Sequence, residues 1–262
     1  MKHSKKIADM FHNEVTAWGV LGICLVITWS VWFISDSHVE QHVAEHFQFE
    51  VEEARQRIFK RMLDYEQVLR GGVALFDTLE RTPTRQEWRR YVRTLQIQTY
   101  FPGIQGIGFS TMLAPSDLQA HVDAVREEGF PDYRVRPEGE RRLYSAIVYL
   151  EPFDWRNQRA FGYDMFSNPM RRSAMERARD TGEPSVSGRV ILVQETREDV
   201  QAGFLVYLPV YRSGLPTDTM LQRRQALIGF VYAPFRVSDL MEGILGSETP
   251  DVGFALYDGR ER

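Results

Sequence analysis

The first strong pattern along the chain is an uninterrupted apolar run near its start. From Ala17 to Ile34 the sequence AWGVLGICLVITWSVWFI carries no charged residue and contains three tryptophans. About 18 apolar residues suit a helix that crosses a bilayer. The run is long for the apolar part of a cleaved signal peptide, and no small-residue cleavage motif follows it. We therefore expect an uncleaved membrane span over residues 17–34.

Charges on either side of this run predict its orientation. Lysines precede it at positions 2, 5 and 6, whereas Asp36, Glu40 and Glu45 follow it. Positive charge favours the cytoplasmic side of a membrane. We expect a cytoplasmic tail over residues 1–16 and a single span in the cell inner membrane, with the rest of the chain on the periplasmic or extracellular side.

Residues 36–70 contain neither proline nor glycine and predict one long stalk helix that ends near Gly71. Apolar residues recur every three or four positions as a narrow stripe: Val39, Val43, Phe47, Val51, Ala54, Ile58, Met62, Tyr65 and Leu69. Such a stripe fits a helix that packs on a second copy of the chain, which predicts a homodimer. It fits equally a solvated helix that covers one side of its own domain.

Three histidines in the stalk, at positions 38, 42 and 46, recur at a four-residue spacing typical of a metal-binding helix face. No carboxylate or cysteine motif completes such a site. We interpret them as a solvent-exposed row and expect no metal.

Beyond the stalk, helical and strand patterns follow one another through short connections. Helices are expected after Thr84, where Glu87 completes a capping box, after Ser116, between Asn168 and Gly182, and over 237–245. Because no repeated βαβ unit is present, we expect the α+β class, with helices against one face of an antiparallel sheet. The expected strands pass through 107–109, 143–150, 161–166, 187–195, 203–211, 226–235 and 251–259.

A polar linker over residues 212–224 separates the earlier strands from a strand, helix, strand pattern that continues to the last residue. This restart predicts the beginning of a second small domain from about residue 216.

Composition narrows the classes of function. The chain has 262 residues, of which 43% are hydrophobic and 26% charged, as in a globular protein. Its 32 basic and 36 acidic residues give a net charge of −4, so nucleic acid is not expected as a partner, because phosphate binding needs a concentrated basic surface. The single Cys24 excludes an internal disulfide and a cysteine-based zinc site. Nucleotide-binding, nucleophile-elbow and metalloprotease motifs are missing, so we expect no enzyme activity and no cofactor.

The run YLEPFDWRNQRAFGYDM, residues 149–165, concentrates acidic, basic and aromatic side chains. Glu151 and Asp154 could supply the acid and base of an extracytoplasmic hydrolase. The arginines of the same run would pair with these carboxylates and hold them ionised. We therefore favour a charge-paired structural turn over a catalytic site.

Asp164, at the end of this run, is the strongest candidate for ligand binding. On a strand it shares a face with Phe166, and burial under the helices would place its carboxylate among aromatic side chains, ready to accept hydrogen bonds from an N–H-rich ligand. Two alternatives remain open: Asp164 caps the turn, or it pairs with Arg159.

Several stretches together resemble the CHASE domain, the extracytoplasmic sensor module of many membrane histidine kinases and diguanylate cyclases, including the plant cytokinin receptors. The resemblance extends over roughly residues 71–259, and an ordered set of motifs is more specific than any one of them. The matching stretches are EWRRYV, FPGIQGIGF, EGFPDYRVRPEG, LEPFDWRNQRAFGYDM, RARDTGEPSVSG, LVYLPVY and GFVYAPFRVSDLMEGILG.

The resemblance implies a long helix followed by two PAS-like domains, a membrane-distal one over 71–215 that holds the ligand and the start of a membrane-proximal one over 216–262. In the cytokinin-binding members an aspartate before the R-A-R-x-x-G helix binds the adenine edge of the ligand, and it matches Asp164. A backbone contact after the helix-ending glycine falls near Val186 and Ser187. The expected ligand site is thus Asp164, Phe166, Val186 and Ser187. The ligand is a small molecule, with a purine-like compound as one option, although the pocket-lining strands depart from the plant pattern.

The resemblance also predicts the function. We expect a sensory input module that relays binding through the long helix to a histidine kinase or diguanylate cyclase output domain outside this sequence, which stops before the second PAS-like domain is complete. The alternative is a ligand-free module that contacts a periplasmic partner protein.

Overall fold

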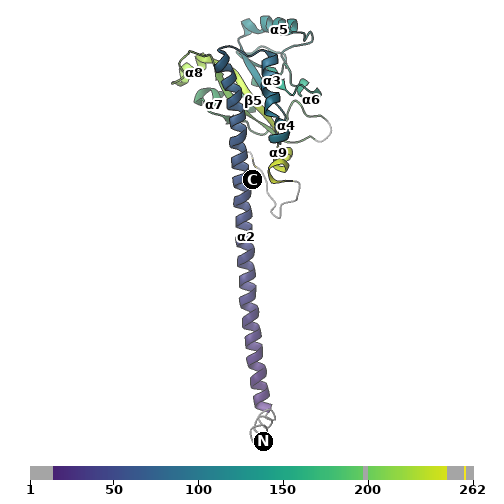
Figure 1. Cartoon of the computed structure of the whole chain (residues 1–262), viewed down its shortest axis with the longest axis vertical. Helices are drawn as coiled ribbons and strands as arrows, with labels where there is room; N and C mark the ends of the chain where they lie inside the picture. Colours follow the sequence, from purple (N-terminus) through teal and green to yellow (C-terminus); the bar gives the residue numbers. More distant parts are fainter. Residues whose placement is uncertain (1–13, 197–199, 247–256, 258–262) are drawn as a thin grey trace. The chain divides into compact units, whose positions relative to one another are not determined.

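The computed structural model of the chain describes residues 14–196, 200–246 and 257, without the side chains of 14–16 and 34–44. The chain divides into two compact units, residues 1–56 and 57–262. As far as it is described, the first unit is the beginning of helix α2, which runs from Glu14 to Leu79 (Figure 1). Among the described helices, none combines the length with the apolar content that crossing a membrane requires. The span expected over 17–34 stays a prediction.

Helix α2 does not end near Gly71, as we expected, but continues through Gly71 and Gly72 to Leu79. The reason is tertiary packing: a Cβ at Gly72 would lie only 3.0 Å from Val231 Cγ1 in the sheet and 3.4 Å from Trp88. Glycine here lets two elements approach closely within a helix that packing stabilises.

The second unit contains one antiparallel sheet of five strands in the order β2-β1-β5-β4-β3. Strand β5 (Leu227–Arg236) lies at its centre, where it pairs with both β1 and β4. We predicted the start of a second domain from about residue 216, but this strand lies in the same sheet as the earlier strands. The other strands are β1 (Ile107–Leu113), β2 (Tyr144–Glu151), β3 (Ser185–Val186) and β4 (Gly203–Tyr211).

Helices cover both faces of this sheet, not the single face that we expected (Figure 1). On one face, the end of α2 packs beside α3 (Arg85–Leu95), α4 (Ile97–Tyr100) and α9 (Val237–Leu245). The core there is aromatic, with Tyr65, Phe76, Trp88, Phe109, Tyr149 and Phe235. The buried part of the predicted stripe on α2, residues 58–69, covers its own domain here.

The opposite face of the sheet is covered by α6 (Trp155–Gln158), the 3₁₀ turn η2 (Met165–Ser167) and α7 (Pro169–Thr181). Alternation along the strands sends side chains to the two faces in turn, so Val206 and Leu208 face α2, whereas Leu205 and Tyr207 face α7. We call the buried layer between the sheet and α7 the α7 layer. It contains Ile147, Leu150, Ala160, Met165, Phe166, Ala174, Met175, Ala178, Val190, Leu192, Leu205, Tyr207, Phe230 and Tyr232.

The capping signals predicted helix ends well in two cases. Thr84 and Glu87 form both halves of the capping box of α3. Asn168 caps α7 by accepting a hydrogen bond from Arg171 N, and Gly182 ends that helix in the left-handed conformation. Ser116 does not cap a helix: its hydroxyl donates to its neighbour's carboxylate, and the 3₁₀ turn η1 (Pro115–Asp117) leads into α5 (Leu118–Glu127).

Other predicted elements differ from the structure. Within 187–195 only one isolated bridge forms, between Val190 and Gly203, because β3 ends at Val186. Residues 161–166 form a turn, isolated bridges at Tyr163 and Asp164, and η2 in place of a strand. The expected linker contains helix α8 (Met220–Ala226), capped by Thr219 and Gln222. The strand expected over 251–259 lies outside the described residues apart from Tyr257.

Candidate functional site

Asp164 is fully buried at the start of η2. Its Oδ1 accepts hydrogen bonds from the backbone N–H groups of Ser145 on β2, at 2.8 Å, and of Phe166, at 3.0 Å. Of the alternatives that the sequence left open, the turn cap is confirmed. Pairing with Arg159 is wrong, because the nearby cation is Arg141, whose Nε lies 3.4 Å from Oδ2.

The second carboxylate oxygen of Asp164, Oδ2, is buried and has no hydrogen-bond partner among the described residues. Arg141 lies within ion-pair distance: its Nε faces Oδ2 at 3.4 Å without forming a hydrogen bond, and its two terminal nitrogens donate to the carbonyls of Pro137, Glu138 and Gly139. Burial raises the pKa of the Asp164 carboxyl, against the opposing effects of its two N–H donors and of Arg141 and Arg172. One buried acceptor oxygen thus remains for a further donor.

The other predicted site residues lie apart from Asp164. Phe166 is buried in the α7 layer. Val186 and Ser187 lie at β3, the sheet edge opposite to β2, and α7 extends between the two edges, in contact with η2, β4 and β3. The Val186 side chain is 45% exposed. The Ser187 hydroxyl is already used, because it donates to Gly188 O and accepts from Leu205 N. The structure therefore places Asp164 and Phe166 together but does not bring Val186 or Ser187 to them.

Three polar side chains of the α7 region were missed by the sequence reasoning. Arg171, Tyr207 and Tyr232 are at most 2% exposed, and Arg171 Nε and both tyrosine hydroxyls lack hydrogen-bond partners among the described residues. A sequence signal for Arg171 existed: it occupies the first position of the buried stripe of α7, followed by Ala174, Met175 and Ala178. An arginine on an apolar helix stripe indicates a charge carried into the interior.

The candidate catalytic carboxylates have structural partners instead. Glu151 accepts from Arg89 Nε at 3.0 Å and from the backbone N–H of Phe153. Asp154 caps α6 by accepting from the backbone N–H of Asn157 at 2.8 Å. Both carboxylates thus have structural roles, but the partners differ from our prediction: Glu151 pairs with an arginine of α3 and not of its own run, and Asp154 caps a helix.

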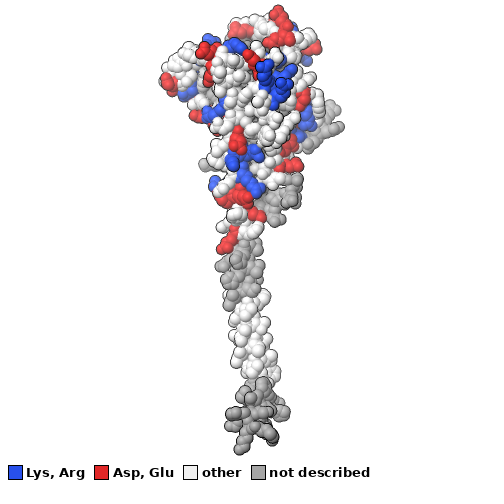
Figure 2. All heavy atoms as spheres, viewed as in Figure 1, with Lys and Arg blue, Asp and Glu red and all other residues white. Residues whose placement is uncertain are grey.

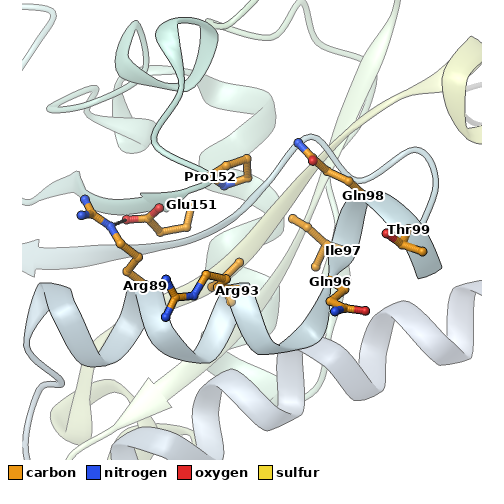
Figure 3. Close-up of a pocket in the computed structure, with 9 residues that line it drawn as sticks. Arg89, Arg93, Gln96, Ile97, Gln98, Thr99, Glu151 and Pro152 are labelled. Atoms are coloured by element: carbon orange, nitrogen blue, oxygen red, sulfur yellow. Dashed lines mark hydrogen bonds and ion pairs between the residues drawn. The ribbon is translucent and has the colours of Figure 1, made fainter.

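Three concave features among the described residues lie along the helices on the other side of the sheet. One cavity, of about 440 Å³, lies along α3 and α4, and among the side chains that line it Arg89 points to Glu151 (Figure 3). A neighbouring hollow of about 420 Å³ is lined by Arg85, Gln86, Arg89, Arg90 and Arg93, and these arginines form the basic surface over α3 in Figure 2. A third, of about 480 Å³, lies between α2 and Tyr91. None of these three cavities is lined by Asp164.

The metal hypothesis for the stalk histidines gains no support. The side chains at positions 38 and 42 lie outside the described residues, and His46 is exposed beside Glu50, at 3.3 Å. Among the described residues, no group of three or more histidine, cysteine or acidic side chains is arranged to hold a metal ion.

Comparison with known proteins identifies a family and a relative of this chain. The sequence profile of the CHASE domain matches residues 81–262. Hybrid signal transduction histidine kinase A of Dictyostelium discoideum is 28% identical over 170 residues, which cover 59% of this chain and 8% of that protein. The chain therefore spans only a small part of the length of this relative.

Proposed function

The chain belongs to the CHASE domain family of receptor sensor modules, and from this premise we propose that it senses a small ligand bound between its sheet and helix α7. The observation that carries the proposal is the fully buried Asp164, whose Oδ2 has no hydrogen-bond donor among the described residues. Leaving such an acceptor unsatisfied costs about 1–3 kcal/mol, and a ligand N–H group at this oxygen would recover that energy.

The opposite face of the sheet offers a direct route for relay. Helix α2 packs on the central strands, with the Phe76 and Phe109 rings 4.5 Å apart and those of Tyr65 and Phe235 5.0 Å apart. Packed interiors transmit displacements because they have little free volume. A ligand that shifts the sheet would therefore move α2, provided that it binds the two states with different affinity.

We further propose that the signal crosses a membrane to an output domain, a histidine kinase or diguanylate cyclase, elsewhere in the whole protein. The similarity to a hybrid histidine kinase supports the kinase option. Exposed apolar side chains over residues 17–33, including all three tryptophans, support a membrane anchor. Exposed Phe59 and Leu63 on α2 support a homodimer through this helix.

The ligand proposal can be tested by binding of adenine, acetamide and benzamide to the full chain in detergent, measured by calorimetry. These probes carry N–H donors without negative charge. We expect at least one to bind, and Asp164→Asn, which replaces the Oδ2 acceptor by a donor, to weaken it at least about tenfold. The matched control is Asp154→Asn, which also changes a helix-capping aspartate but lies on the surface. Equal binding by the Asp164 variant and the wild type would refute the role of Asp164.

A ligand-free interaction module is the second candidate, and the exposed basic surface over α3 favours it. Arg89, Arg90 and Arg93 are exposed and flank open cavities, which suits an acidic protein partner better than a buried small molecule. In that case, replacing Arg90 and Arg93 by glutamine would abolish signalling by the whole receptor, whereas Asp164→Asn would leave it unchanged.

A further inference from the structure

Three hydrogen-bond donors with missing partners gather in the α7 region. Tyr207 and Tyr232 are direct neighbours on β4 and β5, their ring centroids are 6.3 Å apart, and both hydroxyls are buried without a partner among the described residues. Arg171 reaches in from α7, which packs on β4, and its guanidinium lies over the ring of Tyr163, a side chain packed against the same buried layer as the two tyrosines.

Arg171 is only 2% exposed, yet few groups around its guanidinium compensate the positive charge. It makes one long hydrogen bond to Ile191 O, at 3.3 Å, and lies over the Tyr163 ring, 5.0 Å from the ring centroid. It forms no ion pair with an acidic side chain of the described residues, and its Nε has no acceptor. A buried charge is strongly unfavourable without an opposite charge, so the missing partner is an anion.

The tyrosines fit the same partner. Burial raises the pKa of Tyr207 and of Tyr232 well above the ordinary value, so both hydroxyls keep their protons at neutral pH and can donate hydrogen bonds. A guanidinium and two hydroxyl donors together match a carboxylate, which accepts several charge-assisted hydrogen bonds.

The surroundings indicate how polar the rest of the ligand is. Opposite the tyrosines, α7 presents the small side chains of Ala174 and Ala178 on the same stripe as Arg171. The remaining walls are the apolar side chains of the α7 layer. Such walls suit a short aliphatic or aromatic body and exclude a second charged group.

We propose that Arg171, Tyr207 and Tyr232 form a carboxylate-binding subsite, and that the sensed ligand is a small monocarboxylic acid with an apolar body. The inference rests on the proposed function, because it assumes that the α7 layer is the sensory site. Asp164 opens the turn that leads into α7, so an acid that also carries an N–H group could use both ends of the layer.

The test compares acetate and benzoate with acetamide and benzamide, which have similar shapes and no charge, on the full chain in detergent by calorimetry. We expect a carboxylate to bind at least tenfold more tightly than its amide. Arg171→Met should weaken it about 10- to 100-fold, and Tyr207→Phe and Tyr232→Phe about fivefold each. Arg177→Met on the same helix and Tyr100→Phe are matched controls, since both side chains are exposed, and should leave binding unchanged.

The outcomes separate the two proposals. If the amides or adenine bind through Asp164 and the carboxylates do not, the acid subsite is wrong and the sensory site stands. If the carboxylates bind and the Arg171 and tyrosine variants bind equally well, the subsite is again wrong. If neither class binds, both proposals are wrong. Should Arg171→Met not fold, the two nearly isosteric Tyr→Phe variants decide the question.

Discussion

Removing the hydroxyl of Tyr232 should not destabilise this protein, although the side chain is completely buried. The hydroxyl has no hydrogen-bond partner among the described residues, so folding takes it out of water without compensation. Tyr232→Phe removes that cost, and we expect the free energy of unfolding to rise by about 1 kcal/mol, within a range of zero to about 2. Tyr149 is the contrasting case, because its buried hydroxyl donates to Pro83 O at 2.8 Å. Tyr149→Phe should lower the free energy of unfolding by about 1 kcal/mol.

The two variants make a matched pair, since each loses one oxygen atom from a core tyrosine of the same sheet. Urea unfolding of the full chain in detergent, without added carboxylates and followed by near-ultraviolet circular dichroism, measures both changes. Thermal midpoints should move in opposite directions by about 2–4 °C each. If Tyr232→Phe is destabilised as much as Tyr149→Phe, its hydroxyl has a partner, and the argument for a donor cluster around Arg171 fails.

Three further predictions concern stability. Glu195 lies 2.8 Å from the buried Arg236, which keeps Asp239 as a second partner at 2.9 Å, so Glu195→Ala should cost about 2 kcal/mol in urea unfolding, and a loss under about 0.5 would contradict a buried ion pair. A Cβ at Gly108 would lie 2.6 Å from the backbone oxygen of Tyr149, so Gly108→Ala should cost about 2–3 kcal/mol by overpacking, and an unchanged thermal midpoint would show that the sheet can adjust. The pKa of Asp164 is raised in the folded state, so this group's contribution to stability falls as the pH rises from its unfolded pKa, about 3.9, through the folded pKa. The free energy of unfolding of Asp164→Asn should therefore rise relative to that of the wild type as the pH passes through this window, and the difference between the two should stay constant above it. A difference in the free energy of unfolding that does not depend on pH would refute the raised pKa.

Local signals in the sequence predicted those elements whose ends are decided by local chemistry. Asn168, Pro169 and Gly182 mark α7 because capping and backbone conformation are properties of a few adjacent residues. The two glycines at 71–72 misled the same reasoning, since contact with Val231 and Trp88, distant in sequence, decides that α2 continues. Apolar residues over 187–195 do face the core at Val190 and Leu192, but their backbone forms a single bridge, and pairing cannot be read from side-chain pattern.

The candidate site, too, was predicted only in part, because local motifs do not show which residues distant in sequence lie beside it. The ligand hypothesis for Asp164 required that the helices bury it, and in the structure this residue is fully buried. Its charged neighbour was assigned wrongly because Arg141 is brought over Asp164 by the loop before β2, whose path no local motif predicts. The donors of Tyr207 and Tyr232 came together only through the register of β4 and β5, in which these residues are direct partners.

The central place of β5 has a consequence for how the chain is made. During synthesis the β1–β2 pair and the β3–β4 pair emerge first, and the inner edges of β1 and β4 stay without a neighbour until residues 227–236 leave the ribosome. Unpaired strand edges are templates for association with other chains. A nascent chain halted at residue 226 would hold two half-sheets with open edges. The risk of aggregation is therefore greatest while β5 is being translated and is leaving the ribosome.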